Sequence, residues 1–171
     1  GHGADFLPFA AKFELYGIDF SSEMLTLARK YAAKYSFSPR LTVGDITALP
    51  YINEAFDYAI AVATYHHLKA PHRLPALQEL KRVLKPGGYA FITVWNRRQV
   101  KFWFKGREIM VPWRTKEATL YRYYHLFTYP EIKKLAQDAG FTVVKIFAEN
   151  NFRYPVKYFS KNICLVLKKA G

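Results

Sequence analysis

The sequence predicts an α/β fold in which helices and short buried strands alternate to build a doubly wound, mostly parallel sheet. Two observations carry this prediction. Apolar runs the length of buried parallel strands recur along the chain, as at residues 15–18, 56–63 and 89–95. Stretches with apolar residues at helical spacing lie between them. Such alternation is typical of a doubly wound sheet.

Length and composition indicate one folded domain over residues 1–171, with a 51% hydrophobic and 23% charged chain. Lys and Arg number 26 against 13 acidic residues, so the net charge is +13. An excess of this size favours a polyanionic partner, with nucleic acid first and an anionic membrane second. Cys164 is the single cysteine, which excludes an internal disulfide and suits the cytoplasm. Without a membrane-length apolar run or a signal peptide, we expect a cytoplasmic protein that makes no membrane contact.

Residues 15–30 predict a strand, a carboxylate and a capped helix in succession. The apolar run ends at Asp19, Ser21 or Ser22 can cap the following helix, and Glu23 suits the positive end of its dipole. Ligands of open α/β sheets bind outside the carboxyl ends of the strands, where Asp19 would lie. A carboxylate there can accept hydrogen bonds from both hydroxyls of a ribose. For an isolated aspartate, a plain helix cap is the alternative.

Two further features fit a nucleoside site. Gly1 and Gly3 precede a predicted helix, and glycine lets the backbone approach a ligand and point N–H groups at it. The strand over residues 41–45 ends at Asp45, which can accept from the amine of an adenine while Ile46 covers a ring face. A solvated turn is the other interpretation. Because no strand precedes the glycines, we expect the N-terminal strand of the sheet to be missing.

The strand over residues 56–63 leads to two adjacent histidines, His66 and His67. Neighbours in sequence point in different directions, and no cluster stands at metal-ligand spacing. We therefore expect no metal and assign both histidines a positioning role in the site.

The second half of the chain predicts the remaining elements of the sheet. A helix with leucines at buried spacing ends at Lys85–Gly88, with glycine as a left-handed cap, and a strand follows over residues 89–95. A helix over residues 130–139 ends at Gly140. Strands follow at residues 141–147 and 163–167, and we expect the last strand to be antiparallel to its neighbour.

Residues 96–127 interrupt the alternation and form a basic, aromatic insertion on the substrate side. Eight arginines and lysines over this stretch face two glutamates, with tryptophans and tyrosines interleaved. Basic groups can meet phosphates while aromatic faces stack on unpaired bases, which is the chemistry of RNA loops. The alternative is an aromatic lid packed over the sheet edge.

Taken in order, these motifs resemble the class I S-adenosylmethionine-dependent methyltransferases. The resemblance is carried by GHG, YGIDFSSEML, GDITALPY, FDYAIAVATYHHL and ELKRVLKPGGYAFI, which cover most of residues 1–95. Within this family, Met110–Arg114 and Arg122–Phe127 are similar to the tRNA wobble-uridine (carboxymethyluridine) methyltransferases. The family's strand before the glycines normally occupies the middle of a Rossmann-like sheet.

The resemblance implies S-adenosyl-L-methionine as cofactor, tRNA as substrate and a small activator subunit as a candidate partner. The cofactor would contact Gly1, His2, Gly3, Asp19, Phe20, Met24, Asp45, Ile46 and Ala63. The substrate would contact His66, His67, Asn96, Arg97, Trp113, Arg122 and Tyr124. The catalytic candidates are Arg114, whose fork can hold both oxygens of a carboxylate, and His125.

Three other functions remain open on the sequence. A small-molecule methyltransferase, such as one acting on a quinone precursor, would share the motifs through KPGG. A non-catalytic RNA-binding protein would have lost its cofactor site. A nicotinamide-dependent Rossmann dehydrogenase shares the glycine turn and ribose acid, but KPGG before a strand and VPWR fit it poorly.

Overall fold

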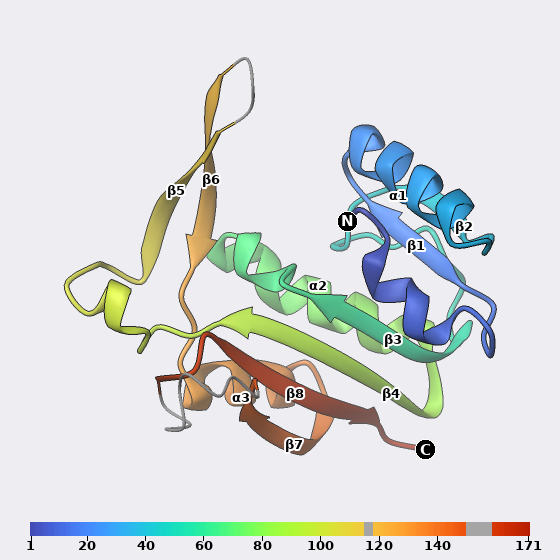
Figure 1. The fold of residues 1–171 in the computed structure, drawn as a ribbon. Helices are drawn as coiled ribbons and strands as arrows, with labels where there is room; N and C mark the ends of the chain where they lie inside the picture. The colour runs from blue at the N-terminus through green and yellow to red at the C-terminus, as the bar shows by residue number, and fades with distance from the viewer. Residues whose placement is uncertain (115–117, 150–158) are drawn as a thin grey trace. The chain divides into compact units, whose positions relative to one another are not determined.

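The computed structural model describes residues 1–114, 118–149 and 159–171 (Figure 1). It divides into two compact units, residues 1–50 and residues 51–171. The α/β class is confirmed, since helices alternate with strands in parallel pairs. That residues 1–171 form one methyltransferase domain stays a prediction.

The first unit is a parallel strand pair with one helix packed on it. It consists of the 3-10 helix η1 (Ala4–Phe9), strand β1 (Tyr16–Asp19), helix α1 (Ser22–Lys34) and strand β2 (Arg40–Val43). The strands pair in parallel, and α1 buries its apolar face at Leu25, Ala28 and Ala32. The predicted cap is confirmed, because the hydroxyl of Ser21 accepts from the backbone N–H of Met24 at 3.2 Å.

The second unit is built on a four-stranded sheet in the order β3-β4-β8-β7. Its strands are β3 (Phe56–Val62), β4 (Leu84–Trp95), β7 (Phe141–Ala148) and β8 (Asn162–Lys169). Strands β3 and β4 are parallel, whereas β8 runs antiparallel to both β4 and β7. The antiparallel last strand is therefore confirmed.

Helix α2 (Ala70–Val83) follows the short 3-10 helix η2 (Tyr65–His67) and connects β3 to β4, while α3 (Tyr129–Asp138) precedes β7. The core lies between these helices and the two central strands. Its fully buried side chains include Leu77, Ile92, Ile132, Ile163, Leu165 and Leu167. Among the described residues, the structure has no helix long and apolar enough to cross a membrane.

The end of α2 differs from the prediction. The helix stops at Val83, Leu84 already has extended backbone and begins β4, and Gly87 takes its left-handed φ of 77° inside that strand. Pro86 disfavours helical backbone at the residue before it, so the chain becomes extended earlier than the glycines. The turn after α3 does match, because Gly140 has a φ of 85°.

The insertion over residues 96–127 contains a β-hairpin that the sequence analysis did not predict. Strand β5 (Glu108–Arg114) pairs antiparallel with β6 (Thr119–His125), with Glu108 opposite His125 and Arg114 opposite Thr119. The short 3-10 helix η3 (Val100–Phe102) precedes it. Aromatic and β-branched residues in both strands are a hairpin signal that the basic charge obscured. In Figure 1 the hairpin extends away from the four-stranded sheet.

Burial predicts where leucine truncation will destabilise the second unit. Leu165 is fully buried on β8, whereas Leu120 on β6 is 54% exposed. We expect Leu165→Ala to lower the free energy of unfolding by about 2–5 kcal/mol, and Leu120→Ala to change it by less than about 0.5 kcal/mol. Urea unfolding measures both. Equal losses in the two variants would contradict the assignment of β8 to the core.

Candidate functional site

In the first unit, the carboxyl ends of β1 and β2 meet at one edge. Asp19 pairs with Val43 in the parallel register, and the N–H of Gly44 donates to the carbonyl of Asp19 at 3.1 Å. Asp45 follows directly. The backbone nitrogen of Gly1 contacts the carboxylate of Asp19. The structure therefore brings the glycine turn and both predicted carboxylates to the same edge of this unit.

The glycine turn has a backbone that only glycine adopts readily. Gly3 has a φ of 88° at the start of η1. A Cβ built there would lie 3.2 Å from Ala28 on α1, so a side chain would also be crowded. The turn thus runs close against the helix that follows β1. The carboxylate of Asp19 is fixed as well, because its Oδ1 accepts from the N–H of Ser21 at 2.9 Å.

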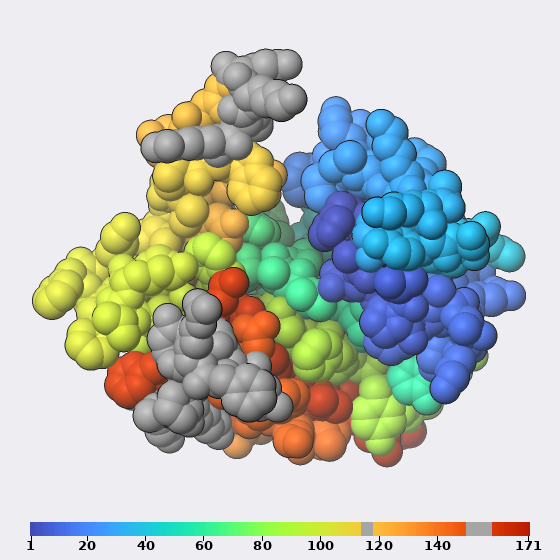
Figure 2. Space-filling model, in the orientation of Figure 1, coloured from blue at the N-terminus to red at the C-terminus, as the bar shows by residue number. Residues whose placement is uncertain are grey.

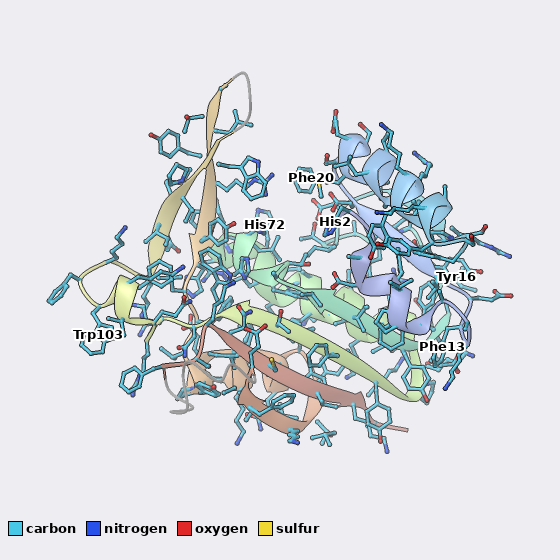
Figure 3. The ribbon with its side chains drawn as sticks, in the orientation of Figure 1. His2, Phe13, Tyr16, Phe20, His72 and Trp103 are labelled. Carbon is cyan, nitrogen blue, oxygen red and sulfur yellow. The ribbon has the colours of Figure 1, made fainter. Side chains whose placement is uncertain are left out.

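Apolar side chains accompany the two carboxylates. Phe20, next to Asp19, is 84% exposed, and Met24 and Ile46 are half-buried. Asp45 accepts from the N–H of Thr47 at 2.8 Å, which orients its exposed carboxylate. Figure 3 labels Phe20 and His2, which both belong to the first unit and are exposed. Exposed rings beside oriented carboxylates suit a ligand with polar hydroxyls and a flat apolar face.

In the second unit, the chain leaves β3 through an unusual backbone conformation. Ala63 has a φ of 56°, and its N–H donates to the hydroxyl of Thr93 at 2.9 Å. A non-glycine residue in the left-handed region costs on the order of 1 kcal/mol or more, and such residues gather at functional sites. This observation supports a functional turn at Ala63. Its contact with the cofactor stays a prediction.

Three aromatic rings stack where β4 ends. The ring of Trp95 lies 4.3 Å from that of Tyr124 and 5.4 Å from that of His66, between centroids, and Tyr124 and His66 are 4.9 Å apart. Nδ1 of His66 accepts from the backbone N–H of Trp95 at 3.2 Å. Burial, with a smaller contribution from His67, lowers the pKa of His66 to about 3. His66 is thus neutral at pH 7, and its positioning role in the site stays a prediction.

Arg73 of α2 contacts both strands of the hairpin at its base. Its guanidinium donates to Glu108 at 3.2 Å and to the hydroxyl of Tyr123 at 2.9 Å. His67 contacts the carbonyl of Tyr123 at 3.0 Å through Nδ1. The sequence analysis did not single out Arg73, because these partners lie 35 and 50 residues away along the chain and leave no local signal.

His125 lies in the interior at the end of β6. Its side chain is buried, and Nε2 is 2.6 Å from Oε1 of Glu131 on α3. Burial raises the pKa of Glu131, but the hydrogen bond and charge of His125 outweigh burial, so the net pKa is lowered. The Glu131–His125 pair therefore fastens the hairpin to α3. A catalytic role for His125 stays a prediction.

The remaining predicted substrate residues divide into buried and exposed ones. Asn96 is fully buried and donates through Nδ2 to the carbonyl of Ser160 at 2.9 Å. The N–H of Arg97 donates to the carbonyl of Phe127 at 2.7 Å. On the hairpin, the guanidinium of Arg122 lies 4.0 Å from the ring centroid of Trp113, which is 49% exposed. The side chain of Arg114 lies outside the described residues.

The part of the chain that the structure describes contains no group of three or more histidine, cysteine, aspartate or glutamate residues able to hold a metal. Cys164 is free and buried in β8, and burial raises the pKa of its thiol to about 11.

Comparison with known proteins identifies the family of this chain. Residues 1–88 match the family described as a methyltransferase domain. The chain is 31% identical over 138 residues to a putative methyltransferase of Encephalitozoon cuniculi, covering 76% of this chain and 63% of that protein. It is 33% identical over 148 residues to the demethylmenaquinone methyltransferase of Protochlamydia amoebophila, covering 77% of this chain and 60% of that protein.

A third relative is the tRNA (carboxymethyluridine(34)-5-O)-methyltransferase of Schizosaccharomyces pombe. The identity is 29% over 131 residues, covering 61% of this chain and 58% of that protein. This chain therefore spans about 60% of the length of these curated relatives.

Solved structures share the fold. An S-adenosylmethionine-dependent methyltransferase of Clostridium acetobutylicum matches with a TM-score of 0.81 at 16% identity, covering 100% of this chain and 81% of that one. A putative methyltransferase of Haloferax volcanii, solved with the Trm112 methyltransferase activator, matches with a TM-score of 0.74 at 18% identity. The match covers 100% of this chain and 79% of that one.

The buried, neutral His66 predicts a pH dependence of stability. A histidine whose pKa falls on folding binds fewer protons in the folded state, so its contribution to stability is lost as pH falls below about 6.5. We expect this residue to account for about 2 kcal/mol of lost unfolding free energy between pH 7 and pH 5. His66→Asn keeps an acceptor for Trp95 and should lack that loss. Urea unfolding at both pH values measures it; equal losses in the variant and the unmodified protein would exclude His66 as the source.

Proposed function

This chain belongs to the methyltransferase domain family, and from that membership we propose that it transfers the methyl group of S-adenosylmethionine to the carboxymethyl group of a wobble uridine in tRNA. The observation that carries the proposal is the meeting of Gly3, Asp19 and Asp45 at one edge of the first unit. The supporting observations for an RNA substrate are the net charge of +13 and the basic, aromatic hairpin.

The cofactor would be held by the edge of the first unit. Gly1 and Gly3 let the backbone approach its methionine end, and Asp19 accepts hydrogen bonds from the ribose hydroxyls. Asp45 accepts from the adenine amine, while Phe20 and Ile46 cover apolar faces. S-adenosylmethionine supplies an activated methyl group, so the protein's own task is alignment and exclusion of water.

The substrate would need no general base. A carboxylate has a pKa of about 4 and is ionised at pH 7, so it can attack in line. Holding two reactants in line is worth on the order of 7–11 kcal/mol. Arg114 would hold both carboxylate oxygens through its fork, while Trp113 and Arg122 present an aromatic face and a cation beside it. His125 is the second candidate for holding the carboxylate.

The relatives support this substrate without fixing it. The relative from Schizosaccharomyces pombe is named for carboxymethyluridine 34 of tRNA. The structural relative from Haloferax volcanii was solved with an activator, and the proposal accordingly includes tRNA and a small activator subunit as partners. It also includes a cytoplasmic location.

A small-molecule methyltransferase is the second candidate, favoured by the similarity to a demethylmenaquinone methyltransferase. Such an enzyme would turn over a quinone precursor with no steep salt dependence. For binding of tRNA through its phosphates, the logarithm of the affinity should instead fall linearly with the logarithm of the salt concentration. Titration of tRNA and of a quinone precursor at several salt concentrations separates the two.

The cofactor assignment predicts the effect of neutralising Asp19. We expect Asp19→Asn to weaken S-adenosylmethionine binding by about tenfold or more, since hydrogen bonds to a charged acceptor contribute about 1.5–3 kcal/mol. Asp5→Asn, in η1, removes the same charge from an exposed position and should leave affinity unchanged. Isothermal calorimetry measures both. No cofactor binding by the unmodified protein would favour the non-catalytic RNA-binding alternative.

The substrate assignment predicts the effect of changing Arg114. We expect Arg114→Ala to reduce methyl transfer to tRNA by about 10- to 100-fold while cofactor affinity is unchanged, because the two-pronged contact to the carboxylate is lost. Arg114→Lys keeps the charge without the fork and should recover only part of the rate. Mass spectrometry of tRNA nucleosides quantifies the product, and unaltered turnover in Arg114→Ala would refute the assignment.

A further inference from the structure

A pocket of about 450 Å³ lies within the second unit, beside η3 and the start of α3. Its volume is in the range of small-ligand sites. Three arginines, two aromatic rings and one hydroxyl line it: Arg97, Arg98, Trp103, Arg107, Thr128 and Phe159. We propose that this pocket binds one nucleotide of single-stranded RNA, with the phosphate on the arginines and the base against the two rings. The choice of RNA rests on the proposed function.

The loop that carries the pocket is held by buried polar groups. Asn96 donates through Nδ2 to the carbonyl of Ser160 at 2.9 Å, and its Oδ1 accepts from the N–H of Arg98 at 3.0 Å. Gln99 donates to the carbonyls of Asn96 at 3.1 Å and Lys161 at 2.9 Å. Asn96, Gln99 and Ser160 are all buried. The loop is thus fixed in place, so little ordering cost would oppose binding.

The aromatic wall is set in position while remaining accessible. Trp103 is 51% exposed, and its indole N–H donates to the carbonyl of Arg98 at 3.1 Å. Its ring centroid lies 5.9 Å from that of Phe159, at an interplanar angle of 50°. Figure 3 shows Trp103 beside η3, and in Figure 2 the yellow-green segment that contains η3 lies at the surface. Stacking on such rings is sequence-tolerant, as every base has a flat face.

The surrounding charge favours an anion. Burial lowers the pKa of Lys101, and the nearby positive charges of Lys161 and Lys105 lower it further. A bound phosphate would reduce the repulsion among these positive charges. Arg107 is partly balanced by Glu131, 3.7 Å away. Arg97 keeps its place by donating through Nη1 to the carbonyl of Phe102.

The combination of cations and rings selects among anionic ligands. In duplex RNA the bases are stacked on each other and cannot reach a protein ring, whereas unpaired bases can. Inorganic phosphate would use the arginines alone. The rings therefore make single-stranded RNA the favoured ligand.

The test measures binding of a fluorescein-labelled 12-nucleotide oligouridine and of a 12-base-pair RNA duplex by fluorescence anisotropy. We expect the unmodified protein to prefer the single strand. Trp103→Ala should weaken single-strand binding about tenfold, and Trp103→Phe should recover most of that loss. Arg98→Ala should lower the slope of log affinity against log salt by about 0.7.

Lys168→Ala is the matched control, because it removes one positive charge from the opposite end of β8, where Lys168 pairs with Tyr89. It should change affinity by less than about twofold. Thermal unfolding verifies that each variant is folded, and Arg98→Ala and Trp103→Phe keep the test intact should Trp103→Ala unfold. Unchanged binding in both Trp103→Ala and Arg98→Ala, or equal affinity for duplex and single strand, would overturn the pocket.

Failure of the pocket and failure of the proposed function have different signatures. Loss of RNA affinity in the pocket variants without any methyl transfer to tRNA by the unmodified protein would refute the tRNA substrate and keep the pocket. Methyl transfer that is unaffected in Trp103→Ala and Arg98→Ala, together with unchanged RNA affinity, would refute the pocket and keep the tRNA substrate. Competition by inorganic phosphate alone, with no effect of Trp103→Ala, would also refute the nucleotide assignment.

Discussion

The arrangement of the second unit depends on the side chain of Trp95 at the end of β4. Its ring stacks on Tyr124 of the hairpin at 4.3 Å and on Phe102 of η3 at 5.8 Å. Its backbone donates to His66 and accepts from Phe127 at 3.0 Å. Aromatic pairs of this kind contribute about 0.5–1.5 kcal/mol each beyond the area they bury. One residue thus joins the sheet, the hairpin and the loop that carries the pocket.

The predicted contacts divide between the two units in a way that follows from strand direction. Both parallel strands of the first unit end at one edge. The direction of the strands alone therefore brings Asp19 and Asp45 to that edge. The second unit instead gathers cations and rings on the hairpin and on the η3 loop. Hydrogen-bond acceptors suited to a nucleoside therefore lie at the ends of parallel strands. The cations suited to a polyanion lie on a hairpin and a loop.

The sequence predicted the features that depend on local pattern. Six strands, the Ser21 cap and the position of Asp19 at the end of β1 follow from apolar runs and from the residues that close each run. Strand β2 ends at Val43, so Asp45 lies two residues beyond it. The hairpin was missed because the basic, aromatic composition of residues 96–127 favoured an RNA-binding insertion or an aromatic lid over a pair of strands. Burial of Asn96 also could not be predicted, since its partner, Ser160, is 64 residues away. A polar side chain looks the same in sequence whether it meets a ligand or a distant carbonyl.

Glu131 illustrates how closely helix and hairpin are tied. Its carboxylate closes the capping box at Thr128, contacts His125 at 2.6 Å and lies 3.7 Å from Arg107. A change of this one acid would disturb a helix start, a buried imidazole and a surface cation at once. We therefore expect related chains to change Arg107, His125, Thr128 and Glu131 together. Chains with only one of the four changed should be rare.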